Sequence, residues 1–161
     1  WLLGFVLKIF FYPTSEGDTF DGGVCLLFFI LVAKCSDIGA YLLGSLIGRH
    51  KMIPKVSPGK TWEGFAGAIL LSTAVALVFS HYFGATKLGG MTLAHAAVLG
   101  PLMAVGAVLG DLVESVFKRD SGVKDSGSFF PGIGGILDLL DSLLFNAPLM
   151  FLYLRLVLFN D

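Results

Sequence analysis

Charged residues are scarce in this sequence. Only 14% of the 161 residues are Asp, Glu, Lys or Arg, whereas soluble domains contain about 25%. Hydrophobic residues make up 55%, and the mean hydropathy is +0.83. This balance excludes an ordinary soluble domain, and several apolar runs reach the roughly 20 residues that a membrane-spanning helix requires. The sequence therefore predicts an all-α, polytopic bundle of transmembrane helices with a polar cavity open to the cytoplasmic face.

Cysteine and histidine are also rare, with two and three residues respectively. Cys25 and Cys35 lie within one apolar segment, which favours small buried thiols over a disulfide or a metal site. A net charge of −1 gives no indication of nucleic-acid binding, and we expect no nucleic-acid partner. The distribution of the charges is more informative than their sum.

Apolar segments of helical length divide the chain. The sequence opens on Trp1 inside such a segment, so we interpret it as the C-terminal fragment of a longer chain, forming one integral membrane domain over residues 1–161. Polar loops are expected at 13–23, 49–63, 84–94 and 118–135. The predicted spans, the first of them truncated, are 1–12, 24–48, 64–83, 95–117 and 136–159.

The loops differ in charge. The 49–63 and 118–135 loops are basic, and alternating spans place both on the same side of the membrane. The other side carries the acids Glu16, Asp18 and Asp21. By the positive-inside rule the basic side is cytoplasmic. We therefore expect an integral membrane protein whose basic loops face the cytoplasm.

Two ions lie in the middle of the 24–48 span. Lys34 and Asp37 are three residues apart and therefore share one face of a helix. One interpretation is a pair that only locks two helices together. The other is a functional role, because ions within a membrane usually line a polar cavity.

Glycine is abundant, with 21 residues against an average near 7%. Gly44 and Gly48, and likewise Gly106 and Gly110, form GxxxG pairs. Such pairs let helix backbones approach closely in lipid, so we expect most of these glycines to serve packing. Glycine-rich helix faces also permit a homodimer.

The most polar part of the chain, from Asp111 to Asp141, lies between two apolar segments. Asp111 and Glu114 end one predicted span, and Asp138 and Asp141 begin the next with the same i, i+3 spacing. Two helices meeting at the cytoplasmic face would present these four carboxylates to each other. Oxygen ligands without sulfur suit Mg²⁺ or a similar hard cation, and zinc is not expected.

Between these helix ends lies KRDSGVKDSGSFFPGIGG. Lys118, Arg119 and Lys124 supply cations for phosphate. Gly134 and Gly135 lead into a helix whose N-terminus favours negative charge. Acids for a metal and bases for phosphate together suggest phosphoryl or nucleotidyl transfer. The alternative is a solvated loop with ordinary basic anchors, which does not require interspersed carboxylates.

The 49–63 loop contains the motif SPGKTWEG, which begins at Ser57. Its GKT resembles the end of a P-loop, but G-x-x-x-x-G-K-[ST] requires glycine at the position of Pro54. We also expect no strand before it, and therefore reject a P-loop. A plain positive-inside loop is the alternative to a functional one, and Trp62 suits the membrane interface in both cases.

Together these segments resemble the phosphatidate cytidylyltransferase (CDP-diacylglycerol synthase) family. Its C-terminal signature is S-x-apolar-K-R-x4-K-D-x-small-x2-apolar-P, then x-H-G-G-apolar-x-D-R-apolar-D. Upstream, DIGAYLLG and SPGKTWEG resemble the family's D-x-x-A-Y-x-x-G and S-P-x-K-T-x-E-G elements, so the likeness covers about residues 34–145. Within the signature region, 111–141, the residues in register are Ser115, Phe117, Lys118, Arg119, Lys124, Asp125, Gly127, Phe130, Pro131, Gly134, Gly135, Ile136, Asp138, Leu140 and Asp141.

Two positions depart from this signature. The family histidine before Gly-Gly is Ile133 here, and the arginine between the last two acids is Leu139. Without this histidine and arginine, the chain loses side chains that could contact a phosphate or a base of the substrate. We expect the change to alter the affinity for the substrate or the choice of substrate. The acids expected to hold metal are retained, which favours an active enzyme.

The resemblance implies transfer of a cytidylyl group from CTP to phosphatidate, giving CDP-diacylglycerol and pyrophosphate in phospholipid biosynthesis. Both substrates are anionic, so Mg²⁺ and basic side chains would neutralise their repulsion and the charge on pyrophosphate. A second, monovalent ion is compatible with this site. The acyl chains of the lipid stay in the bilayer, so the substrates would meet at the cytoplasmic ends of the helices.

The resemblance also implies roles for individual residues. Asp37 would lie deeper in a polar cavity, and Gly134 and Gly135 would contribute to substrate binding. The catalytic phosphate-binding cations would be Lys118, Arg119 and Lys124. The residues contacting nucleotide or lipid phosphate from the facing loop would be Ser57, Lys60 and Thr61. The metal ligands would be Asp125, Asp138 and Asp141, with Asp111 and Glu114 as further candidates.

Two other functions fit part of the pattern. A polyprenol or phytol kinase-like membrane enzyme also uses CTP, but it transfers the γ-phosphate and releases CDP. An ion-coupled transporter would use Lys34, Asp37 and the acid cluster as an ion path, but it gives no reason for the two polar motifs. A CDP-alcohol phosphotransferase would require D-G-x2-A-R…G-x3-D…D, which this sequence lacks.

Overall fold

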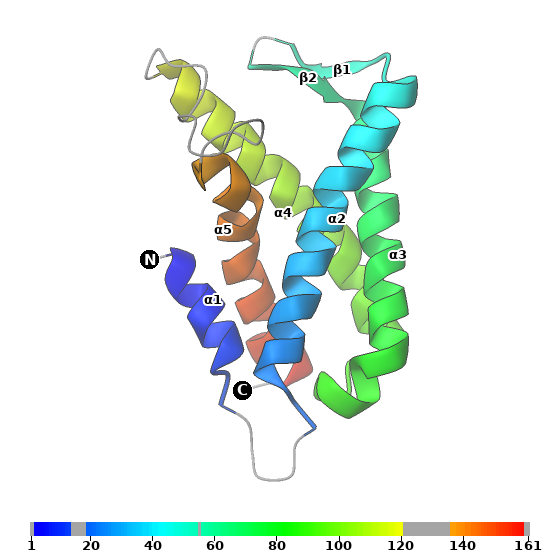
Figure 1. The fold of residues 1–161 in the computed structure, drawn as a ribbon, viewed down its shortest axis with the longest axis vertical. Coiled ribbons are helices and arrows are strands. Elements are labelled where there is room, and N and C mark those ends of the chain that lie inside the picture. Colours follow the sequence, from blue (N-terminus) through cyan, green and yellow to red (C-terminus); the bar gives the residue numbers. More distant parts are fainter. Residues whose placement is uncertain (1, 14–18, 55, 121–135, 160–161) are drawn as a thin grey trace.

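The computed structural model describes residues 2–13, 19–54, 56–120 and 136–159, with the side chains of 2, 3 and 136–141 excepted. This part of the chain is mostly helical, as predicted (Figure 1). Three of its helices, α2, α3 and α4, are long and apolar enough to cross a membrane. The helices are α1 (Leu2–Phe10), α2 (Gly22–Ile47), α3 (Trp62–Lys87), α4 (Leu93–Asp120) and α5 (Ile136–Tyr153), which the π-helix η1 (Leu154–Leu158) continues.

Side-chain caps determine where α2 and α3 begin. The Asp21 carboxylate accepts hydrogen bonds from the backbone N–H groups of Gly23 at 2.9 Å and Val24 at 3.2 Å. The Thr61 hydroxyl accepts one from the N–H of Gly64 at 3.1 Å. Such caps satisfy N–H groups that have no partner within the helix. Each long helix therefore starts where a polar loop residue precedes an apolar run.

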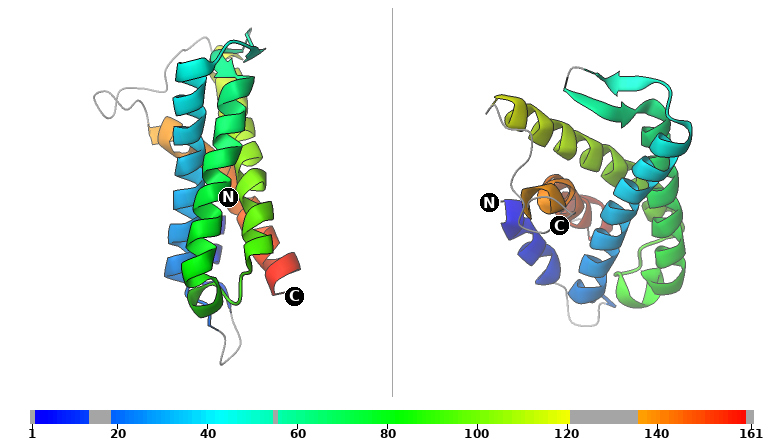
Figure 2. Two further views of the ribbon diagram at one scale, coloured as in Figure 1. Left: turned by 90° about the vertical axis from the view of Figure 1, so that its right-hand side faces the viewer. Right: turned by 45° about the horizontal axis from the view of Figure 1, so that its top comes forward.

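The helices pack as a bundle of antiparallel neighbours. α2 lies against α3, α3 against α4, and α4 against α5. α5 also contacts α1 and α2, so it lies between α1, α2 and α4 (Figure 2). This order leaves α2, α3 and α4 to form the walls of the polar end of the bundle.

Glycines bring α2 and α3 into direct backbone contact, as expected for GxxxG-rich helices. A Cβ atom at Gly39 would overlap the carbonyl oxygen of Gly67, and one at Gly67 would overlap that of Gly39. Gly44, predicted to serve packing, faces Gly64 of α3. Likewise, a Cβ at Gly106 of α4 would overlap the Asn146 side chain of α5. The predicted packing role of Gly44 and Gly106 is therefore confirmed.

We expect Gly67→Leu to destabilise the bundle by about 1–3 kcal/mol, the usual cost of overpacking a close contact. The midpoint of thermal unfolding in detergent should fall by several degrees. Gly4→Leu is the matched control, because a Cβ at Gly4 has no atom within 4 Å. Equal midpoints for the two variants would contradict the close approach of α2 and α3.

The 49–63 segment, predicted to be a loop without a strand, forms a β-hairpin instead. β1 (Lys51–Ile53) pairs antiparallel with β2 (Ser57–Thr61). The prediction was wrong because Pro54 and Pro58 suggested irregular backbone. A two-stranded sheet has only edge strands, and an edge strand tolerates proline where its missing N–H would face away from the partner. GKT lies in β2 and ends at Thr61, the N-cap of α3, but Pro54 occupies the position where a P-loop requires glycine, so the P-loop stays rejected.

The apolar core fills the end of the bundle away from the hairpin. It contains the first half of α2, the second half of α3 and the first half of α4, together with the end of α5. Phe28, Phe29, Leu99, Met103 and Met150 are fully buried there. The other end, beside the hairpin, carries the charged side chains Lys60 and Asp111.

The hairpin and the end of α4, which carries the described start of the 118–135 segment, lie at the same end of the bundle, as alternating spans predicted. Figure 1 shows the hairpin beside the carboxyl-terminal half of α4, which ends in Lys118, Arg119 and Asp120. The opposite end carries Asp21, whose carboxylate lies 3.9 Å from the ammonium of Lys87. The hairpin, Lys118 and Arg119 therefore lie at one end of the described bundle, and Asp21 lies at the other.

Candidate functional site

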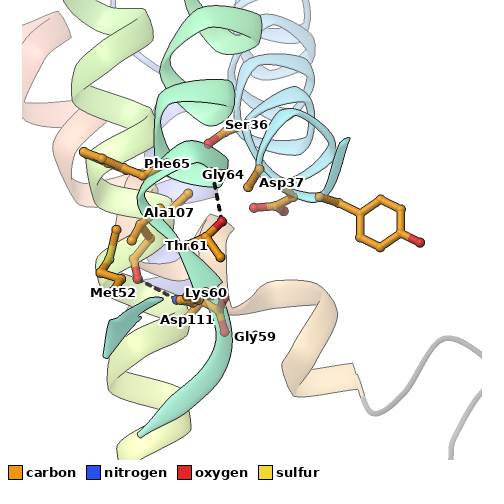
Figure 3. Close-up of a pocket in the computed structure, with 13 residues that line it drawn as sticks. Ser36, Asp37, Met52, Gly59, Lys60, Thr61, Gly64, Phe65, Ala107 and Asp111 are labelled. Atoms are coloured by element: carbon orange, nitrogen blue, oxygen red, sulfur yellow. Dashed lines mark hydrogen bonds and ion pairs between the residues drawn. The ribbon is translucent and has the colours of Figure 1, made fainter. Parts of the chain in front are cut away.

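A cavity of about 390 Å³ lies between α2, α3, α4 and the hairpin (Figure 3). Glycine and alanine at positions 40, 59, 64 and 107 contribute small side chains to its walls. The polar cavity expected from the sequence is therefore present at the hairpin end. Its polar lining residues are Ser36, Asp37, Tyr41, Lys60, Thr61 and Asp111.

Lys60 reaches from β2 to α4 across this cavity. Its ammonium lies 2.8 Å from the Asp111 carboxylate and donates a hydrogen bond to the Val108 carbonyl at 3.0 Å. The Lys60 side chain is 15% exposed, whereas that of Asp111 is 50% exposed. A cation enclosed in this way and oriented by two acceptors is placed to bind an anionic group that enters the cavity.

Thr61 and Ser57, the other two hairpin residues predicted to bind substrate, lie differently with respect to the cavity. Thr61 is buried and lines the cavity, but its hydroxyl already accepts the capping hydrogen bond from Gly64. Ser57 begins β2 and is not among the described residues that line the cavity. Of the three, Lys60 is the residue whose charged group the fold presents to the cavity.

The base of the hairpin is fastened to α3 by Glu63. Its two carboxylate oxygens accept hydrogen bonds from the backbone N–H of His50 at 3.3 Å, and one oxygen lies 2.6 Å from the His50 ring. The backbone N–H of Trp62 donates to the His50 carbonyl at 3.0 Å. These contacts hold the strand that carries Lys60 over the cavity. The only sequence signal for them was the glutamate of SPGKTWEG.

Lys34 and Asp37 form the predicted ion pair, with the ammonium 3.3 Å from the carboxylate. Ser142, near the start of α5, joins them. Its hydroxyl donates to Asp37 at 3.1 Å and accepts from Lys34 at 3.2 Å. The group links α2 to α5, while Asp37 also lines the cavity. Asp37 therefore both pairs with Lys34 to link two helices and lines the cavity. Ser142 was not predicted, because an isolated serine has no distinguishing sequence pattern.

We expect Lys34→Met to destabilise the protein by about 2–3 kcal/mol, because it leaves the Asp37 carboxylate without its cation within a membrane-spanning helix. The double variant Lys34→Met, Asp37→Asn should recover most of this loss. Thermal unfolding of both variants in detergent measures the difference. If the double variant is no more stable than the single one, the pair does not compensate charge.

The acids near the end of α4 do not form one cluster. Asp111 faces Lys60, whereas Glu114 is buried and its carboxylate lies 2.9 Å from the ammonium of Lys118. Arg119 is exposed at the end of the helix. Among the described side chains, no group of three His, Cys, Asp or Glu residues could hold a metal ion. A metal role for Asp111 or Glu114 stays a prediction.

The other predicted residues lie outside what the structure describes. Lys124, Asp125, Gly134 and Gly135 fall within residues 121–135. Asp138 and Asp141 fall on α5, among the residues whose side chains are not described. Their proposed roles rest on the sequence pattern alone and stay predictions.

The comparison with known families matches residues 1–157 to the cytidylyltransferase family. The chain belongs to the cytidylyltransferase family. The match includes every element that lines the cavity: α2, the hairpin, α3 and α4.

Individual relatives of this chain are bacterial proteins. It is 41% identical over 131 residues to phosphatidate cytidylyltransferase of Haemophilus influenzae, covering 81% of this chain and 46% of that protein. It is 43% identical over 143 residues to phosphatidate cytidylyltransferase of Staphylococcus epidermidis, covering 88% and 52%. The uncharacterized protein YnbB of Escherichia coli is 40% identical over 144 residues, covering 89% and 46%. The chain thus spans about half the length of these relatives, and one of them has no stated activity.

Proposed function

We propose that this protein transfers a cytidylyl group from CTP to phosphatidate, giving CDP-diacylglycerol and pyrophosphate in phospholipid biosynthesis. The observation that carries the proposal is the contact of Lys60 with Asp111 inside the cavity. It brings the SPGKTWEG motif against the first residue of the signature region, 111–141. Relatives named phosphatidate cytidylyltransferase support the same substrate pair.

The reaction joins two anions, which defines what the side chains must do. A phosphate oxygen of the lipid attacks the α-phosphorus of CTP, a new P–O bond forms, and the bond to pyrophosphate breaks. No strong general base is required, because the attacking oxygen is already ionised. Lys60 would hold a CTP phosphate and stabilise the charge that develops on departing pyrophosphate. Lys118 and Arg119, at the same end of the bundle, would supply further cations.

We also propose Mg²⁺ as the cofactor. The described residues that line the cavity offer carboxylate and hydroxyl oxygens and include no cysteine or histidine, which fits a hard cation. When bound, Mg²⁺ would neutralise phosphate charge and favour departure of pyrophosphate. Glu114 is the weaker candidate ligand, because it is buried against Lys118. The first candidates are Asp125, Asp138 and Asp141, with Asp111 second to them.

The proposed location is the bacterial inner membrane, with the cavity facing the cytoplasm. α2, α3 and α4 are long enough to span it, and the relatives are bacterial. The basic hairpin and the basic end of α4 lie together, which supports the cytoplasmic side for the cavity. CTP would then enter from water, while the acyl chains of phosphatidate remain in the bilayer.

The experiment incubates purified protein with CTP labelled at the α-phosphate, phosphatidate and Mg²⁺. We expect a labelled lipid and one pyrophosphate for each lipid formed. Release of CDP without labelled CDP-lipid would identify a kinase that transfers the γ-phosphate to a lipid alcohol. Solute flux without nucleotide turnover would identify a transporter, and either result would overturn the proposal.

A further inference from the structure

Ser36 differs from the other buried serines among the described residues in its hydrogen bonding. It lies on α2 beside Asp37, lines the cavity and is 1% exposed. Its hydroxyl makes no hydrogen bond to any described residue. Other buried serines are satisfied within the protein: Ser72 donates to the Gly100 carbonyl at 3.0 Å, and Ser80 donates to the Met91 carbonyl at 3.1 Å. Since buried polar groups are rarely left without a partner, Ser36 stands out.

The position of Ser36 differs from that of the charged residues of the cavity. It lies about three helical turns before the end of α2 at Ile47. Figure 3 shows it at the end of the cavity away from Lys60 and Asp111. The carboxylate of neighbouring Asp37 is already bound by Lys34 and Ser142. The inner end of the cavity therefore offers a neutral hydroxyl, whereas the hairpin end offers a cation.

This difference indicates which part of a substrate each end would bind. A phosphate placed at Ser36 would lose its hydration without gaining a nearby free cation, which is costly in a region of low dielectric. An uncharged oxygen requires only one hydrogen bond, and a serine hydroxyl can both donate and accept. Ala40 and Ala107 lie along the same cavity and present only small apolar side chains.

We propose that Ser36 binds an uncharged oxygen of the substrate, either a ribose hydroxyl of CTP or an ester carbonyl of the lipid. This inference rests on the function proposed above, and it makes Ser36 a specificity-determining residue. Phosphates would bind at Lys60, while Ser36 would recognise the neutral portion that reaches the inner end of the cavity. The contact satisfies the buried hydroxyl only when substrate is bound.

The test compares Ser36→Ala with Ser72→Ala in CTP-dependent formation of CDP-lipid. Both variants remove one buried hydroxyl from a helix of the same bundle, but Ser72 bonds to a carbonyl of α4 away from the cavity. We expect Ser36→Ala to lower kcat/KM about fivefold, the usual effect of one neutral hydrogen bond. Its midpoint of thermal unfolding should not fall. Ser72→Ala should instead lower the unfolding midpoint and leave kcat/KM close to that of the unsubstituted protein.

Substrate analogues identify the oxygen that Ser36 binds. If it binds ribose, the fivefold loss should disappear with 2′-deoxy-CTP or 3′-deoxy-CTP as substrate. If it binds the lipid, the loss should disappear with an ether-linked phosphatidate that has no ester carbonyl. Equal kinetics for Ser36→Ala and the unsubstituted protein, or the same loss with every substrate pair, would overturn the inference. Failure of the unsubstituted protein to form CDP-lipid would instead count against the proposed function.

Discussion

Lys60→Met should lower kcat/KM for CTP at least about a hundredfold, in the range usual for loss of one preorganised charge-stabilising donor. The ammonium of Lys60 is largely enclosed and lies between the Asp111 carboxylate and the Val108 carbonyl. Methionine keeps the apolar length of the side chain but removes its charge. CTP phosphates would then meet Asp111 without a compensating cation, so both binding and departure of pyrophosphate should suffer.

Lys87→Met is the matched control for this prediction. It removes the same charge at the opposite end of the bundle, where Lys87 is half-exposed and lies 3.9 Å from Asp21. We expect its turnover to stay within about twofold of the unsubstituted protein, because an exposed pair contributes little. Thermal unfolding in detergent distinguishes lost chemistry from lost folding. Near-normal turnover in a folded Lys60→Met variant would remove Lys60 from the proposed site.

Asp138→Asn should abolish CTP-dependent turnover while leaving the protein folded in detergent. Asp138 is the first acid of the D-x-x-D pattern at the start of α5, and we propose it as a ligand of Mg²⁺. Asparagine has nearly the same shape, but it lacks the negative charge that holds a hard cation. Any residual activity should be at least about a thousandfold below that of the unsubstituted protein. It should also require a higher Mg²⁺ concentration.

Asp120→Asn provides the comparison for this second prediction. Asp120 also lies within the signature region, but at a variable position of the motif, and its side chain is exposed at the end of α4. We expect near-normal kcat and an unchanged Mg²⁺ dependence for Asp120→Asn. If Asp138→Asn behaves in the same way, the metal assignment is wrong. Measurement of Mg²⁺ binding by isothermal titration adds a readout that does not depend on turnover.

Much of the fold could be predicted because a membrane protein requires long apolar segments, which are easily recognised in the sequence. Long apolar runs must satisfy their backbone hydrogen bonds internally, so they form helices. The predicted spans 24–48, 64–83 and 95–117 correspond to α2, α3 and α4. Their polar ends were predicted less well: α4 continues to Asp120, because hydropathy does not detect charged helical turns beyond the apolar run.

The hairpin shows where pattern reasoning failed locally. Charge and proline indicated a loop for 49–63, whereas β1 and β2 pair there and Glu63 fastens their base to His50. Short strands of this kind contain too few residues to show a period of two. Their pairing depends on the turn and on contacts with α3, and neither is apparent from composition.

Composition and spacing along the sequence are sufficient to predict helices of membrane-spanning length and to place Lys34 and Asp37 on one helical face. Each follows from spacing within one segment or from composition along it. Packing of the helices brings Lys60 to Asp111, joins Ser142 to Lys34 and Asp37, and places Ser36 on the cavity wall, and no sequence pattern indicated these contacts. These relations depend on which helix faces meet. For α2 and α3, backbone contact between glycines sets how the two helices face each other.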